Sequence, residues 1–132
     1  MATVNYVIAN GEDAGFSRAA YIIWTPLTAT NVDGQPFFSP FYSDKTVQVL
    51  GTFGGATVTM YGVALPASSN PSAGSGHTDY DILHKVDLSN LTFTARGMFV
   101  VLENIGGIYP VATGGDGTTS LTVRLLISQT QR

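Results

Sequence analysis

The chain has 132 residues, enough for one domain, and a formal net charge of -3 at pH 7. Charged residues make up only 11% of it, against about 25% in an average soluble domain. The few Lys and Arg residues are scattered, which argues against a nucleic-acid partner, and the lack of cysteine excludes disulfide and thiolate chemistry. The longest apolar run, residues 19–24, is too short to cross a bilayer, so we expect no membrane partner. A surface of small residues and hydroxyl groups loses water easily against a neighbour, which favours permanent assembly.

Two strands are predicted at the N-terminal end. Residues Thr3–Ala9 are rich in β-forming side chains and stop at residues 10–13, which are typical of a turn. Arg18–Thr25 forms the second strand, which we expect Pro26 to halt because proline cannot donate a ladder hydrogen bond. The apolar residues of this strand do not alternate with polar ones. We therefore expect the strand to be covered on both faces, with its aromatic residues, Trp24 included, in the core.

A segment rich in proline and aromatic residues follows at 31–44. Its two prolines, Pro36 and Pro40, exclude a central strand. Four of its residues carry large rings: Phe37, Phe38, Phe41 and Tyr42. One interpretation is a loop that folds these rings over one end of the core. The other is an arm whose rings contact a partner protein, because aromatic residues are enriched at the centres of interfaces.

A two-residue glycine turn is the clearest local signal in the middle of the chain. Thr46–Phe53 and Ala56–Ala64 flank Gly54-Gly55, a pair that suits a type I′ turn. The pattern therefore predicts a β-hairpin. The residues after it, 65–78, are rich in Ser, Gly and Pro. They predict a long exposed loop, because little apolar surface is available there to offset the entropy of ordering.

The rest of the chain predicts further strands. Asp79–Asp87 is expected to be extended, whereas Leu91–Leu102 fits either a strand or a short helix. Thr118–Ser128 alternates in the manner of a long strand with one buried face, and Ile108–Ala112 is its expected partner. The glycines at 114–117 between them allow a reversal, so a second β-hairpin is predicted.

These elements amount to about seven or eight strands separated by turn signals, with no long amphipathic helix and no internal repeat. We therefore predict an all-β fold: a single-domain antiparallel β-sandwich, jelly-roll-like, over residues 1–132.

Residue types that perform catalysis or bind metals do not form a recognisable motif. His77, Asp79, Asp81 and His84 are close in sequence, but on a strand the two carboxylates face away from His84. Residues 72–76 lack both the spacing and the strand–helix context of a serine-hydrolase nucleophile. We therefore expect no catalytic residue, no metal ligand and no cofactor, and we interpret the protein as a non-enzyme.

Three stretches of the chain resemble a known family. They are VQVLGTFGGATVTMYG within Thr46–Gly62, LTFTARG at Leu91–Gly97, and YPVATGGDGTTSLTV at Tyr109–Val123. Together they are similar to small virion proteins of tailed bacteriophages that resemble capsid decoration, or cement, proteins. The chain departs from that family in two places. Residues 64–76 lack the stretch GSNDGTNW that many members have, and Tyr109 stands where an Arg usually precedes the proline.

The resemblance implies a decoration protein that binds the exterior of the assembled capsid and stabilises contacts between major capsid proteins. It implies two partners, the major capsid protein and further copies of this chain as a dimer or trimer. It also implies a place on the outer surface of the virion, after synthesis in the host cytoplasm. We expect the partner contacts to come from Phe37, Phe38, Phe41 and Tyr42. Two alternatives stay open: a tail or baseplate adaptor, and a β-sandwich module that binds host glycans.

Overall fold

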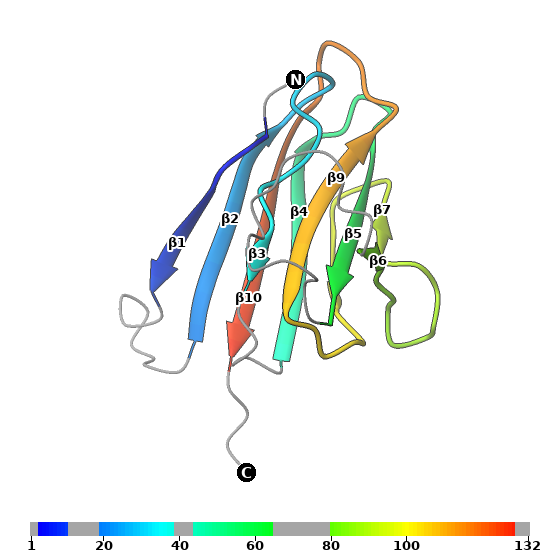
Figure 1. Ribbon diagram of the computed structural model, residues 1–132. Coiled ribbons are helices and arrows are strands. Elements are labelled where there is room, and N and C mark those ends of the chain that lie inside the picture. The colour runs from blue at the N-terminus through cyan, green and yellow to red at the C-terminus, as the bar shows by residue number, and fades with distance from the viewer. Residues whose placement is uncertain (1–2, 11–18, 39–43, 65–79, 129–132) are drawn as a thin grey trace.

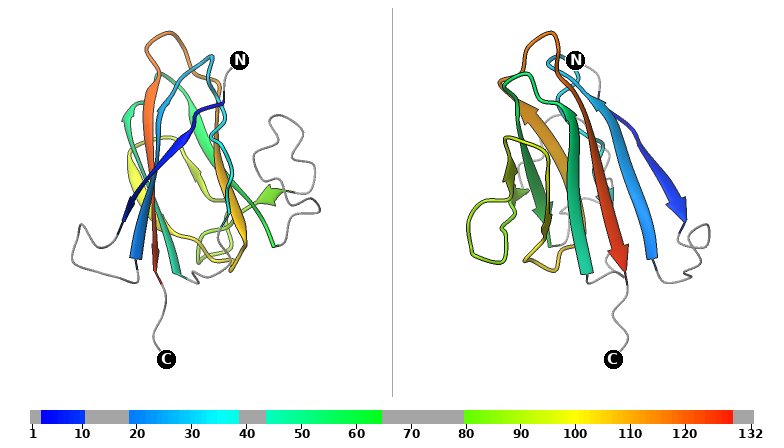
Figure 2. Two further views of the ribbon diagram at one scale, coloured as in Figure 1. Left: turned by 60° about the vertical axis from the view of Figure 1, so that its left-hand side comes forward. Right: turned by 180° about the vertical axis from the view of Figure 1, so that it is seen from behind.

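The computed structural model describes residues 3–10, 19–38, 44–64 and 80–128. Over these residues the chain forms ten β-strands and no helix. The strands are β1 Tyr6–Asn10, β2 Ala19–Leu27, β3 Phe37–Phe38, β4 Asp44–Thr52, β5 Thr57–Val63, β6 Asp81–Ile82, β7 Thr92–Phe93, β8 Gly97–Val100, β9 Gly107–Thr113 and β10 Ser120–Ser128. They form two antiparallel sheets packed as a sandwich (Figures 1 and 2), so the predicted fold class is confirmed. More strands are present than expected because β3, β6 and β7 have only two residues each.

Each of the two sheets is named here after a central strand. The β10 sheet has the strand order β1-β2-β10-β4-β8. The β9 sheet has the order β3-β9-β5-β6, with β7 also paired to β5. β10 pairs with β4 along its whole length, from Ser120 opposite Thr52 to Ser128 opposite Asp44. Four of its side chains point into the core and are no more than 1% exposed: Leu121, Val123, Leu125 and Ile127. The predicted long strand with one buried face is therefore confirmed.

Both predicted hairpins are wrong, because the strands on either side of each glycine turn lie in different sheets. β4 belongs to the β10 sheet and β5 to the β9 sheet. In the same way β9 and β10 are in different sheets, so residues 114–119 lead the chain from one sheet to the other. An alternating pattern shows which face of a strand is buried. Since both sheets turn their apolar faces toward one core, the pattern does not show which sheet the strand joins.

The glycine turns themselves form as expected, and they contact each other at one end of the sandwich (Figure 1). Gly54 and Gly55 have φ angles of 57° and 84°, and the Ala56 N–H donates to the Phe53 carbonyl at 2.9 Å. These are the features of a tight two-residue turn. The Thr119 hydroxyl donates to the same Phe53 oxygen at 2.9 Å. This bond ties the β4–β5 connection to the β9–β10 connection.

β2 continues through Pro26 to Leu27, contrary to the prediction that this proline halts the strand. Leu27 lies opposite Leu121, and Trp24 lies opposite Val123. Two residues of β2 therefore oppose one residue of β10 at Pro26, which is the arrangement of a β-bulge. A bulge takes a residue out of the ladder, so the missing N–H of proline is tolerated there. Trp24 is fully buried, as expected.

The stretch 91–102, for which strand and helix were both possible, forms the two short strands β7 and β8. These strands also lie in different sheets, β7 beside β5 and β8 beside β4. The bend at residues 94–96 between them is therefore another connection from one sheet to the other.

Candidate interaction surfaces

The first half of the proline- and aromatic-rich segment is an edge of the β9 sheet. The N–H of Gly34 donates to the Pro110 carbonyl at 2.9 Å, and the N–H of Ala112 donates to the Val32 carbonyl at 2.8 Å. β3 then pairs with β9. An edge position agrees with the prediction that the prolines exclude a central strand. Residues 32–38 are thus held along β9 by backbone hydrogen bonds.

The aromatic residues expected to contact a partner are placed differently from one another. Phe37 is 9% exposed, and its ring meets the ring of Tyr6 edge-on at 5.4 Å, so this residue serves the core of its own domain. Phe38 is half-buried on the outer side of the β9 sheet. Phe41 and Tyr42 lie outside the described residues. A partner contact through this segment stays a prediction.

The outer face of the β10 sheet carries many apolar side chains, which lie among polar ones such as Thr46, Gln48 and Thr122. The strand registers place a set of apolar side chains on this face: Val7, Tyr21, Ile23, Leu50, Met98, Val100 and Leu126. Met98 is 62% exposed and Val100 is 52% exposed, while Tyr21 and Ile23 are half-buried. Isolated exposed apolar residues are common on protein surfaces, but many of them on one face of a sheet are typical of an interaction site. The sequence predicted that β2 is covered on both faces, and within the chain its outer face is only half-covered.

A groove of about 390 Å³ lies in the middle of this apolar face. Its lining comes from β2, β4, β8 and β10: Tyr21, Ile23, Thr46, Gln48, Met98, Arg124 and Leu126. Arg124 is exposed and lies opposite Ile23 on one side and Gln48 on the other. Its guanidinium makes no ion pair with the described residues. The groove is therefore mostly apolar, with Thr46 and Gln48 as uncharged polar residues and Arg124 as its one cation.

A second apolar surface is the β6–β7 loop, defined as residues 83–91. Val86 and Leu88 in this loop are 67% and 72% exposed, and Asp87 between them is exposed as well. The loop protrudes beside β6 and β7 in Figures 1 and 2. Leu88 has a φ of 73°, the left-handed region that branched apolar side chains rarely adopt. Strain of this kind persists only where the surrounding structure enforces it.

Hydrogen bonds within the β6–β7 loop hold its shape. The Lys85 N–H donates to the Ser89 carbonyl at 2.8 Å, and the Leu88 N–H donates to the Lys85 carbonyl at 3.0 Å. The Asp87 carboxylate accepts from the Ser89 N–H at 3.0 Å and from the Ser89 hydroxyl at 2.5 Å. The hydroxyl bond is the main reason that the pKa of Asp87 lies below its usual value, so this carboxylate stays ionised at neutral pH.

The base of the loop is anchored to residues next to β8. The Leu102 N–H donates to the His84 carbonyl at 3.0 Å. His84 Nδ1 lies 2.5 Å from one carboxylate oxygen of Glu103, and the His84 N–H donates to the other at 2.9 Å. Burial raises the pKa of Glu103, but the hydrogen bonds from the His84 side chain and backbone outweigh it, so the pKa lies below its usual value. The Lys85 ammonium also lies 3.9 Å from the centre of the Phe99 ring.

The outer face of the β9 sheet is aromatic and largely buried. Tyr61 and Tyr109 stack with ring centres 5.6 Å apart, and Tyr80 meets Tyr109 edge-on at 5.1 Å. Tyr109 is only 7% exposed. Burial, together with the nearby Tyr61, Asp33 and Tyr80, raises the pKa of Tyr109 to about 12. This cluster is a second, smaller core outside the sandwich interior.

The residues considered for metal binding do not come together in the described part of the chain. There, no three His, Asp or Glu side chains are placed to share an ion. His84 pairs with Glu103, Asp81 is exposed at the start of β6, and His77 and Asp79 fall outside the described residues. No helix among the described residues has the length and apolarity to span a membrane.

Sequence reasoning missed the groove and the loop tip. The available signal was Leu126, an apolar residue at an outward position of β10, together with the unbroken apolar run in β2. Pairing β2, β10 and β8 into one sheet was needed to show that these residues form one surface.

A scan against protein-family models finds no match to the chain, and a search of curated proteins finds no relative.

Proposed function

We propose that this chain is a structural protein of a tailed-bacteriophage virion, a capsid decoration protein that binds the exterior of the assembled capsid. Its partners in this proposal are the major capsid protein and further copies of the chain. The observation that carries the proposal is the apolar outer face of the β10 sheet. The resemblance of the two glycine-turn regions to virion proteins supplies the class of assembly.

Exposed apolar side chains on the β10 sheet favour association with another surface. Apolar side chains such as Met98 and Val100 lose contact with water only when another surface covers them, and that burial favours association. A protein that binds only the assembled shell stabilises the shell by mass action, because binding draws the equilibrium toward the assembled state. The low charge of the chain reduces the desolvation cost of broad contacts.

The copy number of the chain in purified virions tests this proposal. A copy number comparable to that of the major capsid protein supports a decoration protein. A number of a few dozen or fewer supports the alternative role in the tail or baseplate. Absence from virions contradicts both roles. The other alternative, a module that binds host glycans, is tested directly with a glycan array.

Capsids that lack the protein give a second test. Purified protein added to such capsids is expected to bind saturably and to raise the temperature at which the shell comes apart. If the purified protein does not bind these capsids, it is not a decoration protein.

A further inference from the structure

We propose that the groove on the β10 sheet is filled by the β6–β7 loop of a second copy of this chain. The proposal rests on the proposed function only in treating the outer face of the β10 sheet as a contact surface, and it names one partner of that surface. Val86 and Leu88 enter the groove in this contact, and Asp87 pairs with Arg124.

The groove and the tip of the β6–β7 loop are chemically complementary. The groove offers apolar walls, among them Ile23, Met98 and Leu126, around a single guanidinium. The loop tip offers two exposed apolar side chains on either side of a single ionised carboxylate. Both surfaces thus offer apolar side chains, and their charges are opposite. A charged pair surrounded by apolar contact fixes the register of an interface and discourages wrong partners.

The β6–β7 loop is held in a fixed shape by hydrogen bonds. Its internal hydrogen bonds and the anchors at Glu103 and Leu102 hold the tip in one shape before any partner is present. A preorganised loop loses little conformational freedom on binding, which strengthens association. Leu88 keeps a φ of 73° while its side chain is exposed, so its strained backbone serves no contact in the core of its own domain.

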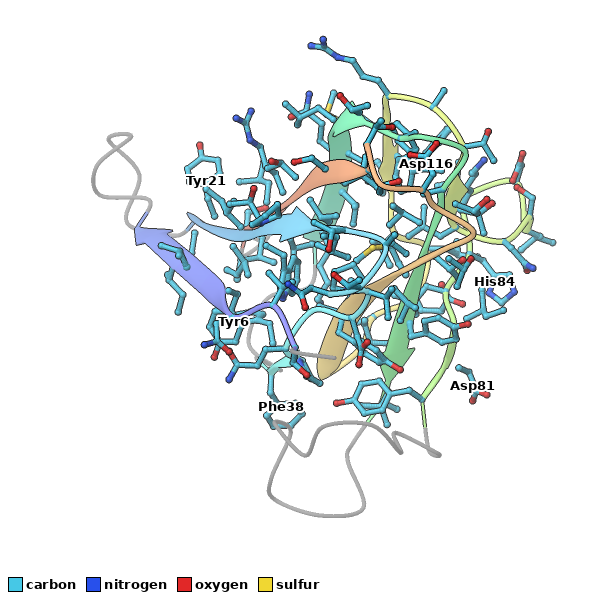
Figure 3. The ribbon with its side chains drawn as sticks, turned by 90° about the horizontal axis from the view of Figure 1, so that it is seen from above. Tyr6, Tyr21, Phe38, Asp81, His84 and Asp116 are labelled. Atoms are coloured by element: carbon cyan, nitrogen blue, oxygen red, sulfur yellow. The ribbon has the colours of Figure 1, made fainter. Side chains whose placement is uncertain are left out.

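Other occupants fit the groove less well. Two copies packed face to face through their grooves would bring Arg124 against Arg124, and like charges at the centre of an interface oppose association. The loop of the same chain cannot enter its own groove, because His84 at the loop base and Tyr21 in the groove lie on different sides of the domain (Figure 3). The contact is therefore between two different patches, the loop of one copy and the groove of the next. Repeated contacts of this kind form a closed ring or an open filament.

Sedimentation of the purified full-length chain, without capsids, tests this inference. The wild-type protein is expected to associate as its concentration rises. Leu88→Asp removes an apolar contact from the loop, and Arg124→Glu reverses the charge in the groove. Each variant is expected to weaken self-association by about tenfold or more, since central interface residues carry most of the affinity. Thr113→Asp, an exposed position on β9, is the control and is expected to associate like the wild type.

Mixing the variants provides the decisive result. Leu88→Asp keeps an intact groove and Arg124→Glu keeps an intact loop. The mixture is therefore expected to form one-to-one dimers at concentrations where each variant alone is mostly monomeric. Thermal unfolding tests whether both variants are folded. If Leu88→Asp does not fold, Val86→Asp takes its place. A wild-type chain that stays monomeric at all concentrations overturns the inference. Folded variants that associate like the wild type, or a mixture that stays monomeric, overturn it too. Capsid binding is measured separately, so the proposed function can stand or fall independently.

Discussion

The outer faces of the two sheets are both apolar but differ in exposure. On the β9 sheet, Tyr109 is 7% exposed and stacks on Tyr61. On the β10 sheet, Met98 is 62% exposed and lines an open groove. The chain thus buries one of its outer faces by itself and leaves the other partly exposed. Apolar composition alone therefore does not identify an interface, because an apolar face can be covered by side chains of its own chain or by another chain.

Truncating a tyrosine on the buried face is expected to have the largest effect on stability. Tyr109→Ala removes a buried ring that contacts both Tyr61 and Tyr80. We expect the free energy of unfolding to fall by about 3 kcal/mol or more, the usual cost of deleting a buried aromatic side chain. Urea denaturation measures this change. A loss below about 1 kcal/mol would mean that this face is not a second core.

The matching change on the exposed face is expected to affect association instead of folding. Leu126→Ser alters a groove side chain that is 37% exposed. We expect the free energy of unfolding to change by less than about 1 kcal/mol, and self-association or capsid binding to weaken by about tenfold. Urea denaturation and sedimentation measure the two quantities on the same sample. A large loss of stability with unchanged association would reverse the roles assigned to the two faces.

Alkaline pH is expected to weaken the buried face selectively. The unfolded chain ionises Tyr109 near its ordinary pKa of 10, whereas the folded protein holds the pKa at about 12. The folded state therefore binds more protons in this window, and stability falls as pH rises from 10 to 12. Tyr109→Phe is expected to lose less stability across this window than the wild type, as measured by urea denaturation at several pH values. Equal losses in both proteins would show that Tyr109 titrates normally.

Acid is expected to loosen the anchor of the β6–β7 loop, with the smallest effect. The pKa of Glu103 is lower in the folded protein than its ordinary value of 4.5, so its contribution to stability is present above that pH. The contribution is lost as pH falls through the lower folded value. Glu103→Gln is expected to be less stable than the wild type at neutral pH, and the gap is expected to narrow in acid. Urea denaturation at neutral and at acidic pH measures the difference in stability between the two proteins. A difference that is the same at both pH values would show that Glu103 does not contribute in this pH-dependent way.

Much of the fold was predictable because several segments carry a local pattern. The inward positions of β10 and the tight turn at Gly54-Gly55 both follow from residues that are near one another in the chain. The pairing of strands was not predictable in this way. β4 pairs with β10, more than sixty residues further along the chain, and not with the strand that follows its own turn.

The candidate site shows the same division. Phe37 is aromatic, a residue type that is common at interfaces. The pairing of β3 with β9 nevertheless places its ring in the core. The groove side chains Ile23, Arg124 and Met98 come from three strands, and no single strand marks them as one surface.

By itself, the sequence determined the all-β class, the buried face of β10 and the positions of the glycine turns. These properties depend on period-two alternation and on backbone freedom at glycine, both of which act over a few residues. The tertiary structure alone decided which sheet each strand joins, which outer face is buried and where the groove lies. Those outcomes depend on contacts between distant strands that compete for the same core, and a local pattern carries no information about that competition.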